Sequence, residues 1–263
     1  MSASSIVQTR RRRAPAHWPW VLVALAWTAA LLAAVTGRRE LIDHHYLLEE
    51  SGLAWPVAAA VFLACWQVMI VAMMLPSSMP MVQMMTYAAR RQGRRISILV
   101  AFLAGYAAVW TGFAVVAFTG DTGIHHLVDA WPWLAAHAFV IGMTTFALAG
   151  AFQFSPLKDR CLTACRSPLG FFTRYYREGV RPAWRLGLRH GLFCVGCCWA
   201  LMLVMFGIGI GSLVWMGVLT GVMVVEKAVP GGKRAIPVVG VALLLLAVLW
   251  LLHPAWLVPV TAS

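Results

Sequence analysis

Long apolar stretches separated by short charged clusters dominate the sequence. The uncharged runs cover residues 14–37, 51–89, 96–120, 130–157, 190–225 and 235–263. A transmembrane helix needs about 20 apolar residues, so nearly every run is long enough to hold one. The pattern predicts helices at 18–36, 53–75 (or 53–87), 96–119, 133–153, 191–210, 212–229 and 235–256. We therefore expect an all-α protein, a polytopic transmembrane helical bundle of about seven helices.

The uncharged run 190–225 is predicted to form two of these helices. A single helix of 36 residues would be about 54 Å long, whereas the hydrocarbon core of a bilayer measures about 30 Å. Three glycines and a serine near the middle of the run favour a turn there: Gly207, Gly209, Gly211 and Ser212. We therefore expect a tight hairpin between the fifth and sixth helices.

The placement of charge orients the chain in the membrane. The formal net charge is +12, from 21 Lys and Arg and 9 Asp and Glu. Lys and Arg accumulate in cytoplasmic segments. With the N-terminus inside, 19 of the 21 basic residues fall in cytoplasmic segments, and six of the nine acids fall in outer loops. This asymmetry predicts a cytoplasmic N-terminus. Because it accounts for the basic charge, we exclude nucleic-acid binding.

We expect one transmembrane helical domain, residues 18–257, between a basic cytoplasmic tail at 1–17 and a short C-terminal tail at 258–263. The first apolar run is longer than the core of a cleavable signal peptide, which favours a retained anchor. Within the domain, residues 155–189 form the main hydrophilic segment, in which aromatic residues alternate with Arg. This composition is typical of an amphipathic segment lying on the anionic inner leaflet.

Seven of the 13 methionines lie at the end of the second predicted helix. Cys65, Met69 and Met73 are one helical turn apart and therefore share one face. Pro76 and Pro80 follow and are expected to break or kink the helix. Thioether sulfur binds soft metals, but methionine is also a pliant apolar filler, and the stripe alone favours packing.

Five of the six cysteines form two tight groups near the predicted cytoplasmic face. The groups are Cys161 with Cys165, one turn apart, and Cys194 with Cys197 and Cys198, with Met202 at the edge of the same helical face. The cytoplasm is reducing, so this grouping favours metal binding or thiol chemistry over structural disulfides. The second helix enters from outside, which brings its methionines to the same side. Thiolate and thioether ligands together prefer Cu(I), and zinc is the less favoured metal because thioether binds it poorly.

Histidine pairs indicate a second candidate metal site on the outer side. His44 and His45 lie in the first predicted outer loop, and His125 and His126 lie in the second. Imidazole with nearby carboxylates suits zinc or Cu(II). The alternative is that these loop histidines are only solvated.

Three further polar residues fall within or beside predicted helices. Glu226 is the only acid near a helix interior, and such groups are functional candidates by default. Its position at the inner end nevertheless favours pairing with Lys227 or Arg189 over proton coupling. Gln67 is expected to form a hydrogen bond between helices, and His190 is a further polar candidate.

Three strings carry a family resemblance: WQVMIVAMMLPS at 66–77, SPLKDRCLTACRSP at 155–168 and GLRHGLFCVGCCWALM at 187–202. With Glu226 and Lys227 they resemble a bacterial family of predicted metal-binding integral membrane proteins. That family is classed as a domain of unknown function, and some members are labelled copper chaperones. The resemblance covers roughly residues 55–230 and implies no catalytic residue. The ligands that it implies are Met69, Met73, Met74, Cys161, Cys165, Cys194, Cys197 and Cys198.

The leading hypothesis is a multi-pass protein of the bacterial inner membrane that binds Cu(I) and acts in copper handling. Its role would be that of a chaperone, a transporter or an assembly factor for a cuproenzyme, and its expected partners are the bilayer and a copper chaperone or cuproenzyme client. One alternative is a membrane thiol-disulfide oxidoreductase with Cys194/Cys197 and Cys161/Cys165 as its dithiols. Disulfide-forming enzymes work on the outer face, so we favour a protein that is not an enzyme. The other alternative is a non-catalytic scaffold in which Met and Cys only pack.

Overall fold

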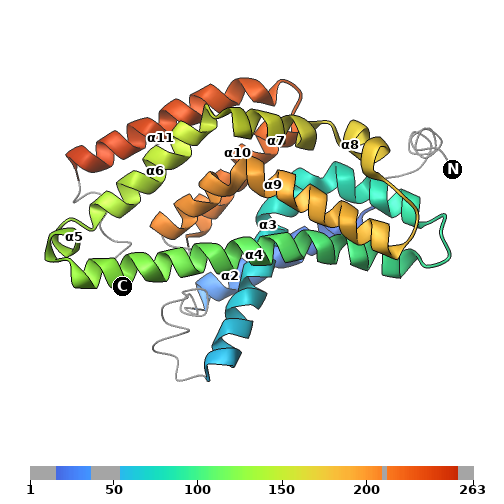
Figure 1. Ribbon diagram of the computed structural model, residues 1–263, viewed down its shortest axis with the longest axis horizontal. Coiled ribbons are helices and arrows are strands. Elements are labelled where there is room, and N and C mark those ends of the chain that lie inside the picture. The colour runs from blue at the N-terminus through green and yellow to red at the C-terminus, as the bar shows by residue number, and fades with distance from the viewer. Residues whose placement is uncertain (1–15, 37–53, 209–211, 254–263) are drawn as a thin grey trace.

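The computed structural model describes residues 16–36, 54–208 and 212–253 (Figure 1). These residues form helices and no β-strand. Five helices are long and apolar enough to cross a membrane: Trp18–Val35, Pro56–Ala89, Arg95–Ala130, Val180–Ile208 and Gly232–Leu252. A bent pair, Phe139–Gln153 with Pro156–Arg166, is a sixth candidate span. The predicted all-α transmembrane bundle is confirmed.

Helices α2 (Trp18–Val35), α10 (Leu213–Ala228) and α11 (Ala235–Leu252) begin within one residue of their predicted starts. Helix α10 has 16 residues, so it is about 24 Å long and shorter than a hydrocarbon core of about 30 Å. A short 3₁₀ helix, η3 (Gly232–Arg234), joins it to α11. Gly209 and Gly211, where we predicted the hairpin before α10, lie outside the described residues.

Helix α3 (Trp55–Ala89) runs through Pro76 and Pro80 without ending, so the longer of the two predicted spans is correct. Figure 1 shows α3 changing direction between its two halves. Proline has no backbone N–H, and Pro76 therefore leaves the carbonyl of Ala72 without its helical partner. The indole Nε1 of Trp27 in α2 donates to this carbonyl at 3.2 Å. The kinked helix is thus held by its neighbour.

Helix α4 (Arg95–Ala130) is about 54 Å long. Helix α4 packs closely against α9 (Val180–Ile208) (Figure 1). A Cβ on Gly187 would clash with the carbonyl of Phe102, and one on Gly105 would clash with the carbonyl of Trp184. Small residues allow membrane helices to approach in this way. Gln67 of α3 also contacts α4, donating to Thr111 Oγ1 at 2.8 Å, which confirms the predicted hydrogen bond between helices.

Helix α4 continues beyond its predicted end at residue 119. Residues 121–130, predicted as an outer loop, form its last turns. Asp121 and Asp129 are polar but compatible with a helix that leaves the bilayer, because water can solvate their side chains. The short helix α5 (Pro132–Ala136) then leads into α6 (Phe139–Gln153), which lies beside α11 (Figure 1).

Helix α7 (Pro156–Arg166) follows α6 after a bend of 65°. Ser155 caps its start, since Ser155 Oγ accepts a hydrogen bond from the Leu157 N–H at 3.1 Å. Helix α7 packs on α9 and α10 and buries Lys158, Cys161 and Leu162. Helix α8 (Pro168–Tyr175) comes next and contacts α3. One face of the predicted leaflet-bound segment 155–189 therefore belongs to the core, not to the membrane surface.

Candidate metal centre

Sulfur atoms from α3, α7, α9 and α10 share one buried core, which we call the sulfur cluster. Its members are Met69, Met73, Met74, Cys161, Cys194, Cys197, Cys198, Met202, Met205, Met216 and Met223. Cys165 is half-buried and packs against them. The structure therefore brings all nine sulfur residues that we predicted as metal ligands into or against one core. Cys65, one turn before Met69, is half-buried and is not part of the cluster.

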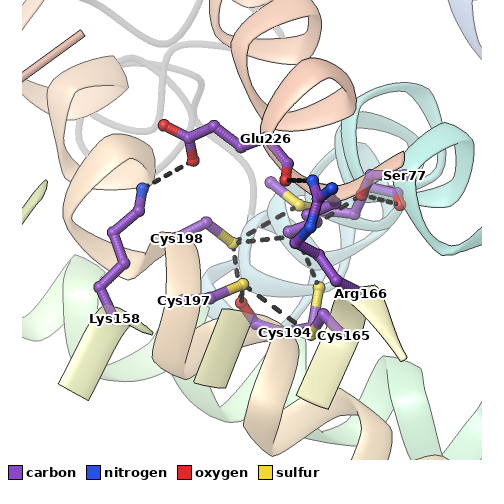
Figure 2. Close-up of polar contacts among 10 residues, drawn as sticks. Ser77, Lys158, Cys165, Arg166, Cys194, Cys197, Cys198 and Glu226 are labelled. Carbon is purple, nitrogen blue, oxygen red and sulfur yellow. Dashed lines mark hydrogen bonds and ion pairs between the residues drawn. The ribbon is translucent and has the colours of Figure 1, made fainter. Parts of the chain in front are cut away.

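Two contacts between helices join thiol and thioether groups. Cys165 Sγ of α7 lies 4.0 Å from Cys197 Sγ of α9. Cys198 Sγ of α9 lies 3.9 Å from Met74 Sδ of α3. Figure 2 shows Cys165 facing Cys197 across the gap between α7 and α9. The three predicted segments therefore meet at sulfur, as the sequence led us to expect.

The local helix geometry explains why the cysteines of α9 lie together. Residues three and four positions apart share a helical face, so Cys197 and Cys198 lie over the turn that begins at Cys194. Their thiols donate to the Cys194 carbonyl at 3.1 and 2.8 Å. Gly196 allows α7 to approach, because a Cβ there would lie 2.6 Å from Cys161 Sγ.

Lys227 of α10 enters the sulfur cluster, which the sequence did not predict. Its Nζ lies 3.2 Å from Cys194 Sγ and 3.6 Å from Cys198 Sγ, and it is 3.5 Å from Ser77 Oγ. Tyr106 adds a hydroxyl 3.2 Å from Cys194 Sγ. Cys194 thus has a cationic and a phenolic neighbour, which stabilise negative charge on its sulfur. The only sequence signal was a lysine following the one intramembrane acid.

Glu226 forms a buried ion pair, as predicted, but with a different partner. Lys158 Nζ of α7 lies 2.7 Å from Glu226 Oε2, and both side chains are almost wholly buried. Lys227 and Arg189, the predicted partners, are not bonded to it in the described part of the chain. Arg166 donates to the main-chain carbonyl of Glu226 (Figure 2) and also to that of Val229. Two side chains of α7 therefore hold the end of α10.

His190 lies one turn before Cys194 and is buried between aromatic rings. Its ring stacks on Tyr106, with centroids 5.5 Å apart, and its Nε2 has no hydrogen-bond partner among the described residues. A small pocket of about 10 Å³ borders it, which is room for one water-sized sphere. The lining residues are Ser77, Ser78, Pro80, Met81, Cys165, Pro168, His190, Cys194 and Lys227.

The candidate outer site finds no support in the described structure. His44 and His45 lie outside the described residues. His125 and His126 lie on the last turns of α4, not in the loop that we predicted, and the His126 side chain is exposed. Over residues 16–36, 54–208 and 212–253, no three His, Cys, Asp or Glu side chains are arranged as a metal site. The inner candidate therefore depends on thioethers as well as thiols.

The fold and its core define the class: a helical membrane protein whose centre is lined with thiols and thioethers. The chain belongs to the PpoB2 copper chaperone family, because the model of that family matches residues 63–250. This confirms the resemblance found in the three sequence strings. Family membership and the membrane-length helices together make the protein a copper-related membrane protein. No curated protein and no solved structure matches the chain.

Proposed function

We propose that this protein holds Cu(I) in its sulfur cluster, within the bacterial inner membrane, and passes it to a copper protein. The observation that carries the proposal is the meeting of α3, α7 and α9 through sulfur, at Cys198–Met74 and Cys165–Cys197. Family membership supports copper as the cargo. Thiols and thioethers together are the ligands that Cu(I) prefers.

The distances in the cluster suit a metal of low coordination number. Metal–sulfur bonds are about 2.3 Å long, so three sulfur ligands around one ion lie about 4.0 Å from one another and two opposite ligands about 4.6 Å. The observed sulfur–sulfur separations are 4.0 and 3.9 Å. The side chains would therefore need to move only slightly to bind a metal. Burial protects such a site from water and oxidants. Each thiol ligand loses a proton when the metal binds.

Copper content of the purified full chain tests the proposal. The protein is loaded with Cu(I) under anaerobic, reducing conditions in detergent, and copper per chain is measured. We expect stoichiometric copper in the wild type and its loss in the variant C194S/C197S/C198S. Cys65→Ser is the matched control, because Cys65 is a half-buried thiol outside the cluster. A wild type without copper, or a triple variant that retains it, would contradict the proposal.

A second function, thiol-disulfide exchange, is favoured by one contact. The 4.0 Å between Cys165 Sγ and Cys197 Sγ must close by about 2 Å to form a disulfide. The two thiols would give two protons and two electrons to an external disulfide acceptor. This pair takes one cysteine from each of the two predicted dithiols. Thiol trapping after treatment with a small disulfide distinguishes the two functions: a Cys165–Cys197 bond in a chain without copper would favour exchange.

A further inference from the structure

Lys227 is a buried cation that faces sulfur and hydroxyl groups. Its side chain is 6% exposed, and its Nζ contacts Cys194 Sγ, Cys198 Sγ and Ser77 Oγ at 3.2–3.6 Å. No carboxylate of the described residues lies within 4.0 Å of Lys227 Nζ. An ammonium has three donors and no acceptor, and these three atoms match its donors in number.

The neighbouring Glu226 and His190 side chains do not neutralise the positive charge of Lys227. Glu226, the next residue, is paired with Lys158 at 2.7 Å, so these two charges neutralise each other. His190 is buried among aromatic rings, and its Nε2 lacks a partner among the residues described. Among the described residues, the sulfur atoms beside Lys227 are thus the groups left to balance its charge. A buried charge is costly unless an opposite charge accompanies it.

The charge of the bound metal decides whether Lys227 is neutralised. When Cu(I) binds two thiols, two protons leave and a complex of charge −1 forms, which the ammonium balances. When a divalent ion such as Zn(II) binds the same two thiols, two protons again leave, but the complex is neutral. The ammonium is then buried without a counter-charge. One lysine therefore favours a monovalent cation over a divalent one.

We propose that Lys227 is the built-in counter-charge of the metal site and selects Cu(I) against divalent metals. The inference rests on the proposed function, since it assumes that Cys194 and Cys198 are the ligands. The ammonium nitrogen is within 3.6 Å of both sulfur atoms, and metal–sulfur bonds are about 2.3 Å long, so a metal bound to both sulfur atoms lies about 4 Å from it. At an effective dielectric of about 20, a unit charge at that distance changes the equilibrium about 1,000-fold.

Metal competition on full-length variants tests this selectivity. Cu(I) and Zn(II) affinities are measured in detergent with chromogenic chelators for the wild type, Lys227→Leu and Lys227→Arg. We expect Lys227→Leu to lower the ratio of Cu(I) to Zn(II) affinity about 1,000-fold and Lys227→Arg, which keeps the charge, to retain most of it. Lys227→Leu replaces the lysine by an apolar side chain without sulfur, so it adds no metal ligand, and Lys227→Gln is the second neutral variant.

The outcomes separate the two proposals. A wild type that binds Cu(I), with an unchanged affinity ratio in the folded neutral variants, would overturn the role of Lys227 and leave the proposed function standing. A wild type that binds no Cu(I) would overturn both. Cu(I) affinity lost only in the neutral variants, with Zn(II) affinity kept, supports the counter-charge, because a general loss of structure would lower both affinities.

Discussion

Replacing Lys158 by Met is expected to destabilise the contact between α7 and α10. Lys158 Nζ lies 2.7 Å from Glu226 Oε2, with side chains 1% and 2% exposed. Glu226 Oε1 has no hydrogen-bond partner among the described residues, so Lys158 is the residue that compensates this carboxylate. Removing one partner of a buried ion pair costs about 3–5 kcal/mol, because the remaining charge is left buried and uncompensated.

The double variant K158M/E226M gives the matched comparison. Replacing both partners of a buried pair by apolar residues is often neutral, so we expect it to recover most of the stability that K158M loses. For a chain of this size, about 3–5 kcal/mol corresponds to a fall in Tm of about 6–20 °C. Thermal unfolding in detergent, followed by tryptophan fluorescence and circular dichroism, measures the shift. A K158M variant as stable as the wild type, or a double variant no more stable than K158M, would refute the reasoning.

Three further predictions concern packing and topology. Gly187→Val places a side chain against the α4 backbone; we expect aggregation in size-exclusion chromatography, and a monodisperse variant would contradict the packing. Gly196→Val, whose Cβ would lie 2.6 Å from Cys161 Sγ, should lower copper per chain by moving α7 away from α9; unchanged copper content would speak against that contact. A cysteine at the exposed Arg174 should react with an impermeant maleimide only from the cytoplasmic side, and one at the exposed Trp131 only from the outside; the reverse labelling would invert the predicted topology.

The helices were predictable because a bilayer tolerates few charges, so charged clusters mark the ends of apolar spans. Helix α2 follows its predicted span to within one residue. The extension of α4 past residue 119 was missed because Asp121 and its polar neighbours resemble a loop. Outside the bilayer a helix can continue with such residues, since water solvates them, and hydropathy does not show where it ends.

The sulfur residues were predictable because helical spacing places Cys194, Cys197 and Cys198 on one face. The contact of Lys227 with these cysteines was not predictable, because it depends on how α10 packs against α9. Lys227 and Cys194 are 33 positions apart in the sequence. In the same way Glu226 was predicted to pair with Lys227 or Arg189, whereas its partner Lys158 lies 68 positions away. Local patterns identify polar groups inside a membrane protein, but only the packing of helices selects their partners.

The glycine contact between α4 and α9 affects how genetic data on this protein should be interpreted. At Gly105 and Gly187 a single methyl group would meet main-chain carbonyls, which cannot move aside as a flexible side chain can. Alanine at either position should therefore reduce the amount of protein in the membrane. Serine at Cys197 should leave that amount unchanged and remove only a sulfur ligand. A copper-sensitive phenotype thus needs a measurement of protein abundance before it can identify a ligand.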